Sequence, residues 1–279
     1  MRSIYKRPED TAAMVPAGEL TRKALDAVEA AIRSGITTLE LDAIAEETVR
    51  AGGGIPNFAL VPGYRHTVCA SVNDAVVHGI PNRRPLEPGD LVSIDAGAKL
   101  GGWNGDSART FLVPGGSPER IAEATRLSDV TKASMWAGIA KLASAKHLSE
   151  VSGAIEDVIV AREDEDGLPL GILEEYAGHG IGRDMHEAPE ILNYRTRGRG
   201  PVVKPGLCVC IEPMVTSGSE EVGEDLDGWT VRTLDGSLGA HWEHTVLVHR
   251  DGIWVSTAPE GGREGLAPFG VVPVLPAGA

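Results

Sequence analysis

The sequence predicts an α+β protein made of two similar halves, in each of which two helices precede a group of strands. Apolar residues recur at helical spacing over about residues 17–51 and again over about 117–163, and the spacing becomes strand-like after both regions. The chain has 279 residues, of which 42% are hydrophobic, and this is enough for one large domain. Because no linker separates the halves, we expect them to share a single domain.

Two helices and three strands are expected in the first half. The first helix is expected over residues 17–34, where apolar side chains recur every four residues, and Gly35 should end it. Thr37 and Glu40 form a capping-box pattern for a second helix over about 38–51. The apolar period then changes to two, so strands are expected over residues 66–72, 91–100 and 103–113.

The second half repeats this order of elements. A third helix should begin at Ser117 and Pro118, a capping residue followed by proline at the first helical position, and should run to about Ala145. A fourth helix is expected over about 149–163. Further strand-like segments follow at residues 206–215, 228–234 and 238–250.

The C-terminal segment differs in composition from the rest of the chain. Residues 259–279 are dominated by Gly, Pro and Ala, so we expect a peripheral extended tail without a helix. Residues 1–258 would then form the single main domain. Phe269, Val271 and Val272 are the tail residues that could contact this domain.

Charge and cysteine content narrow the choice of partners and compartment. The net charge of −14 argues against nucleic acid and anionic membrane as partners. Residues 1–14 lack a signal-peptide core, and no run of residues approaches the length of a membrane span. The three cysteines form no CxxC pair, which favours a reducing compartment, so we expect a cytoplasmic protein.

Four acidic residues and one histidine stand in short motifs marked by Gly, Pro or His: Asp95, Asp106, His179, Glu212 and Glu243. Four carboxylates brought together without cations would repel one another and shift their pKa values strongly. Two divalent cations would neutralise them. Carboxylates with one imidazole suit hard or borderline ions and leave coordination positions for water, as metal-assisted hydrolysis requires.

The spacing of Asp95 and Asp106 supports this interpretation. A two-residue turn centred on Leu100 and Gly101 would place the two carboxylates directly opposite each other, on one face of an antiparallel pair. Opposed carboxylates are destabilising unless a positive charge lies between them. An acidic pair facing solvent near a turn is the alternative, but the apolar neighbours of Asp95 indicate a buried strand.

The other candidate residues vary in the strength of their signal. Glu212 and Glu243 stand in apolar strands, where an unpaired buried carboxylate is costly. His179 lies between two glycines, which let the backbone crowd a ligand. His78 and His186 precede turn residues, and they are either loop histidines or groups for acid catalysis and oxyanion stabilisation. The remaining histidines are expected to be structural: His66, His147, His241, His244 and His249.

Eight sequence blocks together resemble the signature of the type I methionine aminopeptidases of bacterial type, in that family's order: NDAVVHGIP, SIDAG, NGDSARTF, GHGIG, MHEAP, IEPM, GWTVRT and WEHT. The resemblance covers roughly residues 10–258. It implies the pita-bread fold, in which two pseudo-symmetric halves surround a central dinuclear metal site. The five ligand residues alone would also fit the wider group of pita-bread metallopeptidases.

The resemblance also implies roles for individual residues. Two divalent metal ions (Mn, Fe, Co or Zn) would be bound by Asp95, Asp106, His179, Glu212 and Glu243. Glu212 would also be the general base, His78 would contact the scissile amide and leaving amine, and His186 would steady the tetrahedral intermediate. The pocket for the methionine side chain would be lined by Tyr64, Cys69, Met185 and Trp229.

Some positions depart from the family pattern. Val61 and Pro62 replace a common Tyr-His pair, Met185 replaces a common Phe, and Asn104 replaces a common His. These departures leave the metal set intact. They put the details of side-chain selectivity and substrate entry in doubt.

By this resemblance the chain is expected to be an aminopeptidase that removes the initiator methionine when the second residue is small, by dinuclear metal-assisted peptide hydrolysis. Its partners would be Met-terminated peptides and nascent chains, with the ribosome as a candidate partner, and the chain would be a monomer. One alternative is an Xaa-Pro dipeptidase or aminopeptidase of the same fold, although few residues precede the first expected helix. The other is a non-enzymatic pita-bread module that binds peptides or the ribosome.

Overall fold

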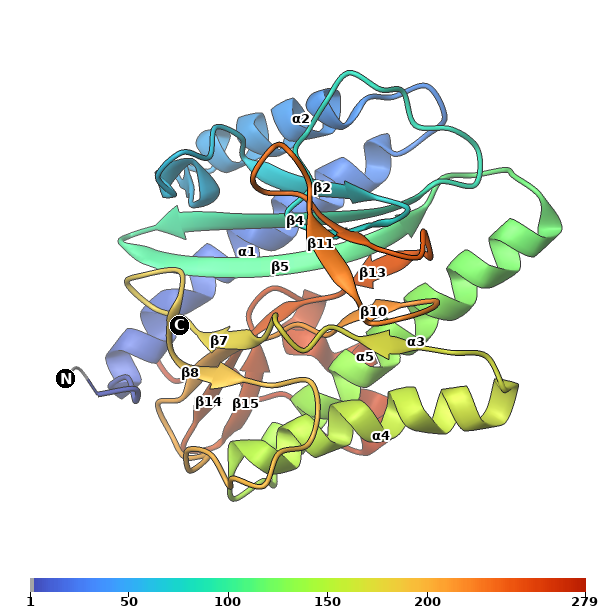
Figure 1. The fold of residues 1–279 in the computed structure, drawn as a ribbon. Coiled ribbons are helices and arrows are strands. Elements are labelled where there is room, and N and C mark those ends of the chain that lie inside the picture. The colour runs from blue at the N-terminus through green and yellow to red at the C-terminus, as the bar shows by residue number, and fades with distance from the viewer. Residues whose placement is uncertain (1–2) are drawn as a thin grey trace.

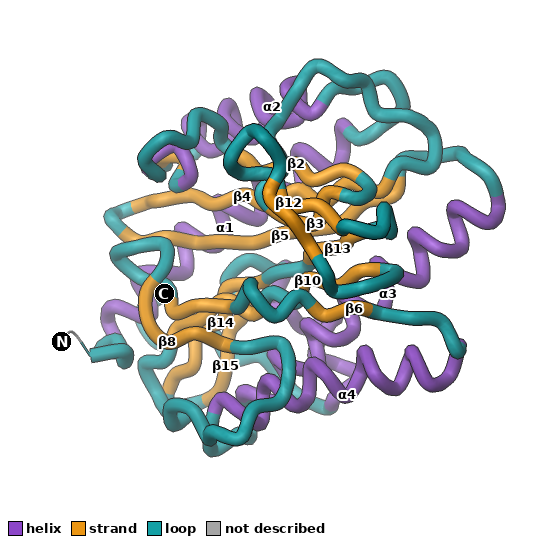
Figure 2. The backbone as a smooth tube through the Cα atoms, in the orientation of Figure 1, coloured by secondary structure: helices purple, strands orange, loops and turns teal. Residues whose placement is uncertain are grey.

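The computed structural model describes residues 3–279 and consists of two stacked halves (Figure 1). The first two residues of the expected domain 1–258 lie outside the described residues. Figure 2 shows the strands in the middle of the molecule and the long helices on its outer sides. The predicted order of two helices followed by strands occurs in both halves.

The first half consists of two helices packed on an antiparallel sheet. Its helices are α1 (Pro8–Ala31) and α2 (Thr38–Ala51), and η1 (Phe58–Leu60) is a short 3-10 turn. The sheet has the order β1-β4-β2, and β5 pairs with the other edge of β4. The strands are β1 (Ile55–Pro56), β2 (Val68–Val72), β4 (Leu91–Leu100) and β5 (Trp103–Leu112). Apolar side chains from both helices and from β2 and β4 form the core of this half.

The second half is organised in the same way. Helices α3 (Pro118–Leu142) and α4 (Leu148–Asp166) pack on a five-stranded sheet of order β15-β14-β9-β7-β8. The strands are β7 (Gly178–Gly180), β8 (Glu187–Ile191), β9 (Cys208–Ile211), β14 (His244–His249) and β15 (Gly252–Val255). The largest apolar cluster of the molecule lies between these helices and this sheet. Cys208 and Cys210 of β9 are buried.

Two small sheets join the halves. One has the order β13-β10-β6, and the other has the order β11-β12-β3, so a strand of the first half pairs with one of the second. Their strands are β3 (Ala75–Val77), β6 (Gly171–Ile172), β10 (Met214–Thr216), β11 (Val222–Glu224), β12 (Val231–Thr233) and β13 (Gly239–His241). A second connection is direct, since Ala108 and Glu243 exchange backbone hydrogen bonds of 3.3 and 2.9 Å.

The helix starts that carry local caps agree with the prediction, and the start of α1 does not. Thr37 and Glu40 form the predicted capping box of α2, and the Ser117 side chain accepts from the backbone of Arg120 at the start of α3. Helix α1, expected from residue 17, already begins at Pro8 and contains Pro16. An interior proline costs about 3 kcal/mol or more. Burial of the first turns against the second half offsets this cost.

The hairpin of β4 and β5 has a different register from the predicted one. Its turn residues are Gly101 and Gly102, which have φ values of 59° and 80°. Two consecutive residues with positive φ match the type I′ turn that favours glycine. As a result Asp95 pairs with Ala108, and Asp106 pairs with Gly97. The two carboxylates therefore share a face of the hairpin in diagonal positions, and the prediction of direct opposition was wrong.

The C-terminal segment is more ordered than predicted. It forms short helical turns, η2 (Pro259–Gly262), α5 (Arg263–Leu266) and η3 (Ala267–Phe269), so the expectation of a tail without a helix was wrong. Gly265 lies against Trp136 so closely that a Cβ would come within 2.2 Å of the indole ring. Leu266 is fully buried in the large apolar cluster. Among residues 3–279, no helix is long and apolar enough to span a membrane.

We predict that Leu266→Ala will lower the free energy of unfolding by about 2–5 kcal/mol, because it opens a cavity in the core. Phe269→Ala is the matched control, since Phe269 is 46% exposed, and it should change this free energy by less than about 1 kcal/mol. Urea unfolding of both variants checks the prediction. Equal small changes in the two variants would contradict the assignment of this segment to the core.

Candidate active site

The structure brings together all five residues predicted as metal ligands, at the junction of the two halves. Asp95 and Asp106 lie on β4 and β5, His179 on β7, Glu212 just after β9 and Glu243 just before β14. The Nε2 atom of His179 lies 3.3 Å from a carboxylate oxygen of Glu212 and 4.0 Å from one of Glu243. Oxygens of Asp95, Asp106 and Glu243 lie within 4.8 Å of one another.

The carboxyl groups of this cluster are buried, and their hydrogen bonding is incomplete. One oxygen each of Asp95, Asp106, Glu212 and Glu243 makes no hydrogen bond within the described part of the chain. Burial raises the pKa of Asp95 and of Glu212 to about 7. Burial and the neighbouring carboxylates raise the pKa of Asp106 and of Glu243 well above the usual range. Unsatisfied buried oxygens of this kind are costly, and divalent cations would satisfy them, so these residues fit a metal site.

His179 is oriented as a metal ligand would be. Its Nδ1 atom lies 3.0 Å from the carbonyl oxygen of Gly180, which can only accept a hydrogen bond, so Nδ1 carries the proton. In the neutral ring Nε2 is then unprotonated and faces the carboxylates. The flanking glycines allow β7 to approach its neighbouring strands closely. A Cβ at Gly178 would lie 2.4 Å from the Cys210 oxygen, and one at Gly180 would lie 2.2 Å from that of Ala188.

Hydrogen bonds between the halves hold Asp106 and Glu243 in place. The Thr245 hydroxyl accepts from the backbone N–H of Asp106 (3.0 Å) and donates to its carbonyl oxygen (2.8 Å). The Ser107 hydroxyl donates to the carbonyl oxygen of Glu243 (2.6 Å). The ring of His244 bonds to the hydroxyls of Ser107 and Thr257, and so it supports this connection without facing the cluster.

His78 and His186 both line a cavity of about 630 Å³ that reaches His179 and Glu212. His78 has a φ of 59° and lies with its ring 5.5 Å from that of Tyr176. Burial lowers the pKa of His78 to about 4, so the ring is neutral at neutral pH. The exposed ring of His186 meets that of His179 edge to face, with centroids 4.4 Å apart. Both histidines are thus placed to contact a molecule in the cavity.

The four residues predicted to line a methionine pocket form one apolar cluster: Tyr64, Cys69, Met185 and Trp229. The rings of Tyr64 and Trp229 lie 5.1 Å apart. Cys69 pairs with Asp95 across β2 and β4, which places this cluster beside the carboxylates. The cluster also contains Phe58, Val61 and Ile80, of which Phe58 and Ile80 were missed. The position of Ile80, two residues after His78, is the signal that could have indicated it.

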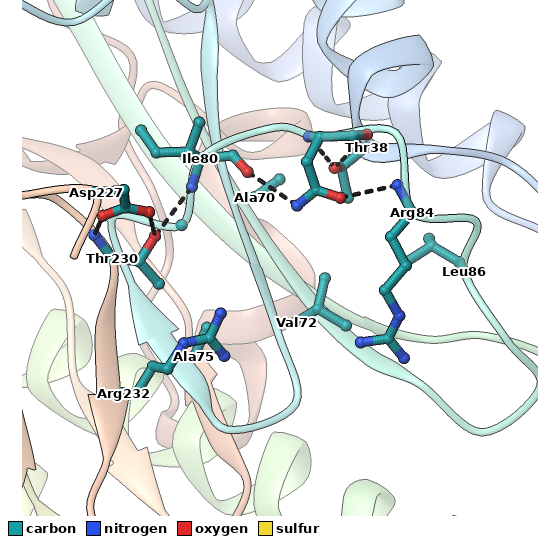
Figure 3. Close-up of a pocket in the computed structure, with 12 residues that line it drawn as sticks. Thr38, Ala70, Val72, Ala75, Ile80, Arg84, Leu86, Asp227, Thr230 and Arg232 are labelled. Carbon is teal, nitrogen blue, oxygen red and sulfur yellow. Dashed lines mark hydrogen bonds between the residues drawn. The ribbon is translucent and has the colours of Figure 1, made fainter. Parts of the chain in front are cut away.

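Hydrogen bonds at Ile80 hold the loop that follows His78, and Figure 3 shows those to Thr230 and on to Asp227. The backbone N–H of Ile80 donates to the Thr230 hydroxyl (3.3 Å), which donates to Asp227 (2.6 Å). Asp227 also accepts from the backbone N–H of Trp229 (2.9 Å). The small pocket drawn in Figure 3, of about 130 Å³, lies on this side of the loop. The hydrogen bonds of Thr230 therefore link the loop after His78 to Asp227, which also bonds the backbone of Trp229.

Two further polar residues near the site make contacts that the sequence did not indicate. Asn104 donates from its side chain to the carbonyl oxygens of Gly182 and Arg183 (both 3.0 Å), which ties β5 to the loop leading to Met185 and His186. His241, expected to be structural, is buried with its Nε2 atom 3.6 Å from a carboxylate oxygen of Glu212. No sequence pattern indicated this contact with Glu212, because the two residues are 29 positions apart.

We predict that Asp95→Asn will raise the melting temperature of the metal-free protein, and that the difference from wild type will grow with pH. The Asp95 carboxyl has a folded-state pKa of about 7 and an ordinary value of about 4 when unfolded. A raised folded-state pKa stabilises the protein fully below pH 4, and this stabilisation is lost as pH rises to about 7. Asparagine has no proton to lose, so its variant should not lose this stability.

Thermal unfolding with a chelator at several pH values tests this expectation, with exposed Asp251→Asn as the control that should match wild type at each pH. Added Mn²⁺ should then stabilise wild type more than Asp95→Asn, because the variant lacks one negative ligand. A temperature difference that stays constant between about pH 4 and pH 7 would show that burial does not act on this carboxyl group.

Comparison with known proteins agrees with this geometry. The chain matches Metallopeptidase family M24 over residues 12–250. It is 47% identical to methionine aminopeptidase 1 of Mycobacterium tuberculosis, over 86% of this chain and 89% of that protein. It is 36% identical to the methionine aminopeptidase of Escherichia coli, over 92% and 94%.

Solved structures show the same relationship. Methionine aminopeptidase from Thermotoga maritima superposes with a TM-score of 0.85 at 34% identity, over 93% of this chain and 100% of that chain. The prolidase of Pyrococcus furiosus, at 23% identity and a TM-score of 0.66, shares the fold alone. The expected pita-bread fold is confirmed. The chain therefore belongs to metallopeptidase family M24, within its methionine aminopeptidase group, and it is a metal-dependent aminopeptidase.

Proposed function

We propose that this protein removes the initiator methionine from peptides and nascent chains in the cytoplasm when the second residue is small. The observation that carries the proposal is the position of the apolar cluster beside the carboxylates. Cys69 of that cluster pairs with Asp95 of the carboxylate group, so a side chain held by the cluster would place its own backbone at the acidic site. The relatives named methionine aminopeptidase support methionine as that side chain.

The same five residues would hold the metal: Asp95, Asp106, His179, Glu212 and Glu243. Their four carboxylates and the free Nε2 atom of His179 match two divalent ions in charge and donor type, with Mn, Fe, Co and Zn all compatible. When bound, the ions would polarise the peptide carbonyl and lower the pKa of a water molecule. A proposed dinuclear site thus fits the orphaned oxygens without a further protein ligand.

Around such a centre, the chain's own residues would bind and orient the peptide. The acidic cluster attracts the protonated α-amine of a peptide, which explains action at the N-terminus. Glu212, whose pKa is raised by burial, would take a proton from the attacking water. His78 and His186 face the same cavity and would hydrogen-bond the scissile amide and the developing oxyanion. The position of these residues along the cavity supports the proposed roles.

The walls of the apolar cluster favour an unbranched side chain. Tyr64 and Cys69 are buried, and their neighbours Met185, Trp229 and Ile80 leave a lining of aromatic and sulfur-containing groups. Methionine adapts its rotamers to an irregular wall and makes favourable contacts between sulfur and aromatic rings. A branched or charged side chain would fit this lining less well, which supports selectivity at the first residue.

We predict that the metal-loaded enzyme will release the first residue from Met-Ala-Ser faster than from Leu-Ala-Ser, Met-Lys-Ser or Ala-Pro-Ser. A misfitted methylene costs about 1–3 kcal/mol, so Leu should reduce kcat/KM by about tenfold to 200-fold, and norleucine should still be cleaved. Chelation should abolish release, and added metal should restore it. Preference for Ala-Pro-Ser over Met-Ala-Ser would instead assign the chain to the Xaa-Pro enzymes of this fold.

We also predict that His186→Ala will lower kcat by about 100-fold while KM changes by less than about fivefold, because its contact would form mainly in the transition state. His249→Ala is the control, since His249 bonds the C-terminal segment at the carbonyl oxygen of Val274, and it should keep wild-type turnover. Steady-state kinetics on Met-Ala-Ser measures both variants. Near-normal turnover of His186→Ala would make this residue a simple loop histidine.

A further inference from the structure

His241 is a buried polar residue that the proposed mechanism does not use. Its side chain is only 2% exposed, and its Nε2 atom makes no hydrogen bond to any described residue. This atom lies 3.6 Å from the Oε2 atom of Glu212, which is just beyond hydrogen-bond distance. A buried imidazole nitrogen without a partner is costly, so its direction toward a ligand carboxylate needs a physical reason.

The backbone of His241 is held by the hairpin that carries two of the carboxylates. The hydroxyls of Ser93 and Thr110 lie 2.8 Å apart and accept from the His241 N–H at 3.2 and 3.0 Å. Thr110 also donates to the carbonyl oxygen of His241 (2.7 Å). Ser93 is two residues before Asp95 on β4, so both side chains lie on one face. The hairpin therefore fixes His241 relative to the acidic cluster.

A second strand contact fixes His241 relative to Glu212. In the ladder of β10 and β13, His241 pairs with Met214, which is two residues after Glu212. The Glu212 carboxylate then lies between two imidazoles, with Oε1 3.3 Å from His179 and Oε2 3.6 Å from His241. Both distances are between nitrogen and oxygen atoms, but the two rings do not offer the same group.

Only one of these rings can donate a hydrogen bond to Glu212. The Nδ1 proton of His179 is directed to the carbonyl oxygen of Gly180, so its Nε2 atom has a lone pair in the neutral ring. The amide of Asn193 donates to the backbone oxygen of Glu212 and does not reach the carboxylate. Within residues 3–279, His241 Nε2 is thus the available donor for this carboxylate.

We propose that His241 is a positioning residue that donates its Nε2–H to Oε2 of Glu212 and so directs Oε1 toward the metal centre. This inference rests on the proposed function, since it assigns His241 to the orientation of a ligand and general base. A donor on one carboxylate oxygen selects one rotamer of the side chain and leaves the other oxygen free for the cavity. Closing 3.6 Å to a hydrogen bond requires a shift of only a few tenths of an ångström.

Two variants of similar size distinguish the effect of the His241 N–H donor from the effect of the side chain's volume. His241→Gln keeps an N–H donor on an unbranched side chain, and His241→Met fills the same space without one. We expect His241→Met to bind Mn²⁺ about 10- to 100-fold more weakly in calorimetry and to lower kcat on Met-Ala-Ser by a similar factor. KM should stay near wild type, and His241→Gln should recover most of both losses.

Other outcomes overturn the inference. Equal losses in the two variants would show that shape matters and the donor does not, and wild-type behaviour of both would show that neither matters. A lower melting temperature of metal-free His241→Met, with unchanged Mn²⁺ affinity and kcat, would make the role structural. If His241→Met does not fold, ¹⁵N-histidine spectra of the Zn²⁺-loaded wild type decide, because the Nε2–H tautomer supports the inference and the Nδ1–H tautomer overturns it. Wild type that neither binds metal nor cleaves Met-Ala-Ser would instead remove the proposed function itself.

Discussion

The structure depends on one electrostatic constraint, which is the burial of four neighbouring carboxyl groups, each with one oxygen that makes no hydrogen bond within the described residues. Removing a charged group from water without a partner costs several kcal/mol in real proteins. The chain supplies these groups from strands of both halves and joins the halves by backbone bonds between Ala108 and Glu243 and by the Thr245 hydroxyl at Asp106. The junction is therefore rigid where the carboxylates would repel, and this rigidity suits a cation that must find its ligands already in place.

The apolar cluster and the acidic cluster are held in position by the same pair of strands, β2 and β4. Because β2 pairs with β4, Cys69 of the apolar cluster faces Asp95 of the acidic cluster, and a shift of this ladder would move both. The loop with His78 is held by Thr230, and Asp227 also holds the backbone of Trp229 in the same cluster. In the proposed function, one connected set of contacts would thus orient a substrate side chain and the bond beside it. Catalysis benefits from such preorganisation, since a misplacement of about 1 Å can cost 100-fold in rate.

The features that were predicted correctly depend on neighbours in the sequence. The caps of α2 and α3 involve residues three positions apart, and the carboxylate anomalies are visible within single strands. The errors have longer-range causes. The start of α1 is decided by packing against the second half, and the order of the C-terminal segment by contact of Gly265 with Trp136. The contact of His241 with Glu212 depends on two sheets meeting, which a local pattern does not encode.

Three residues that depart from the family pattern lie outside the set of five proposed carboxylate and histidine ligands: Val61, Met185 and Asn104. Val61 and Met185 both pack in the apolar cluster, and Asn104 acts through hydrogen bonds to the backbone of the loop that leads to Met185. Met185 in place of Phe is an apolar exchange of similar volume, which usually costs less than about 1.5 kcal/mol. Val61 in place of Tyr removes volume from the cluster, and neither exchange changes its charge. Loss of one cluster carboxylate would instead remove a negative ligand, so the remaining groups would no longer balance two divalent cations. We therefore expect variation in the apolar cluster proposed to select the substrate side chain, and constancy in the cluster that would hold the metal.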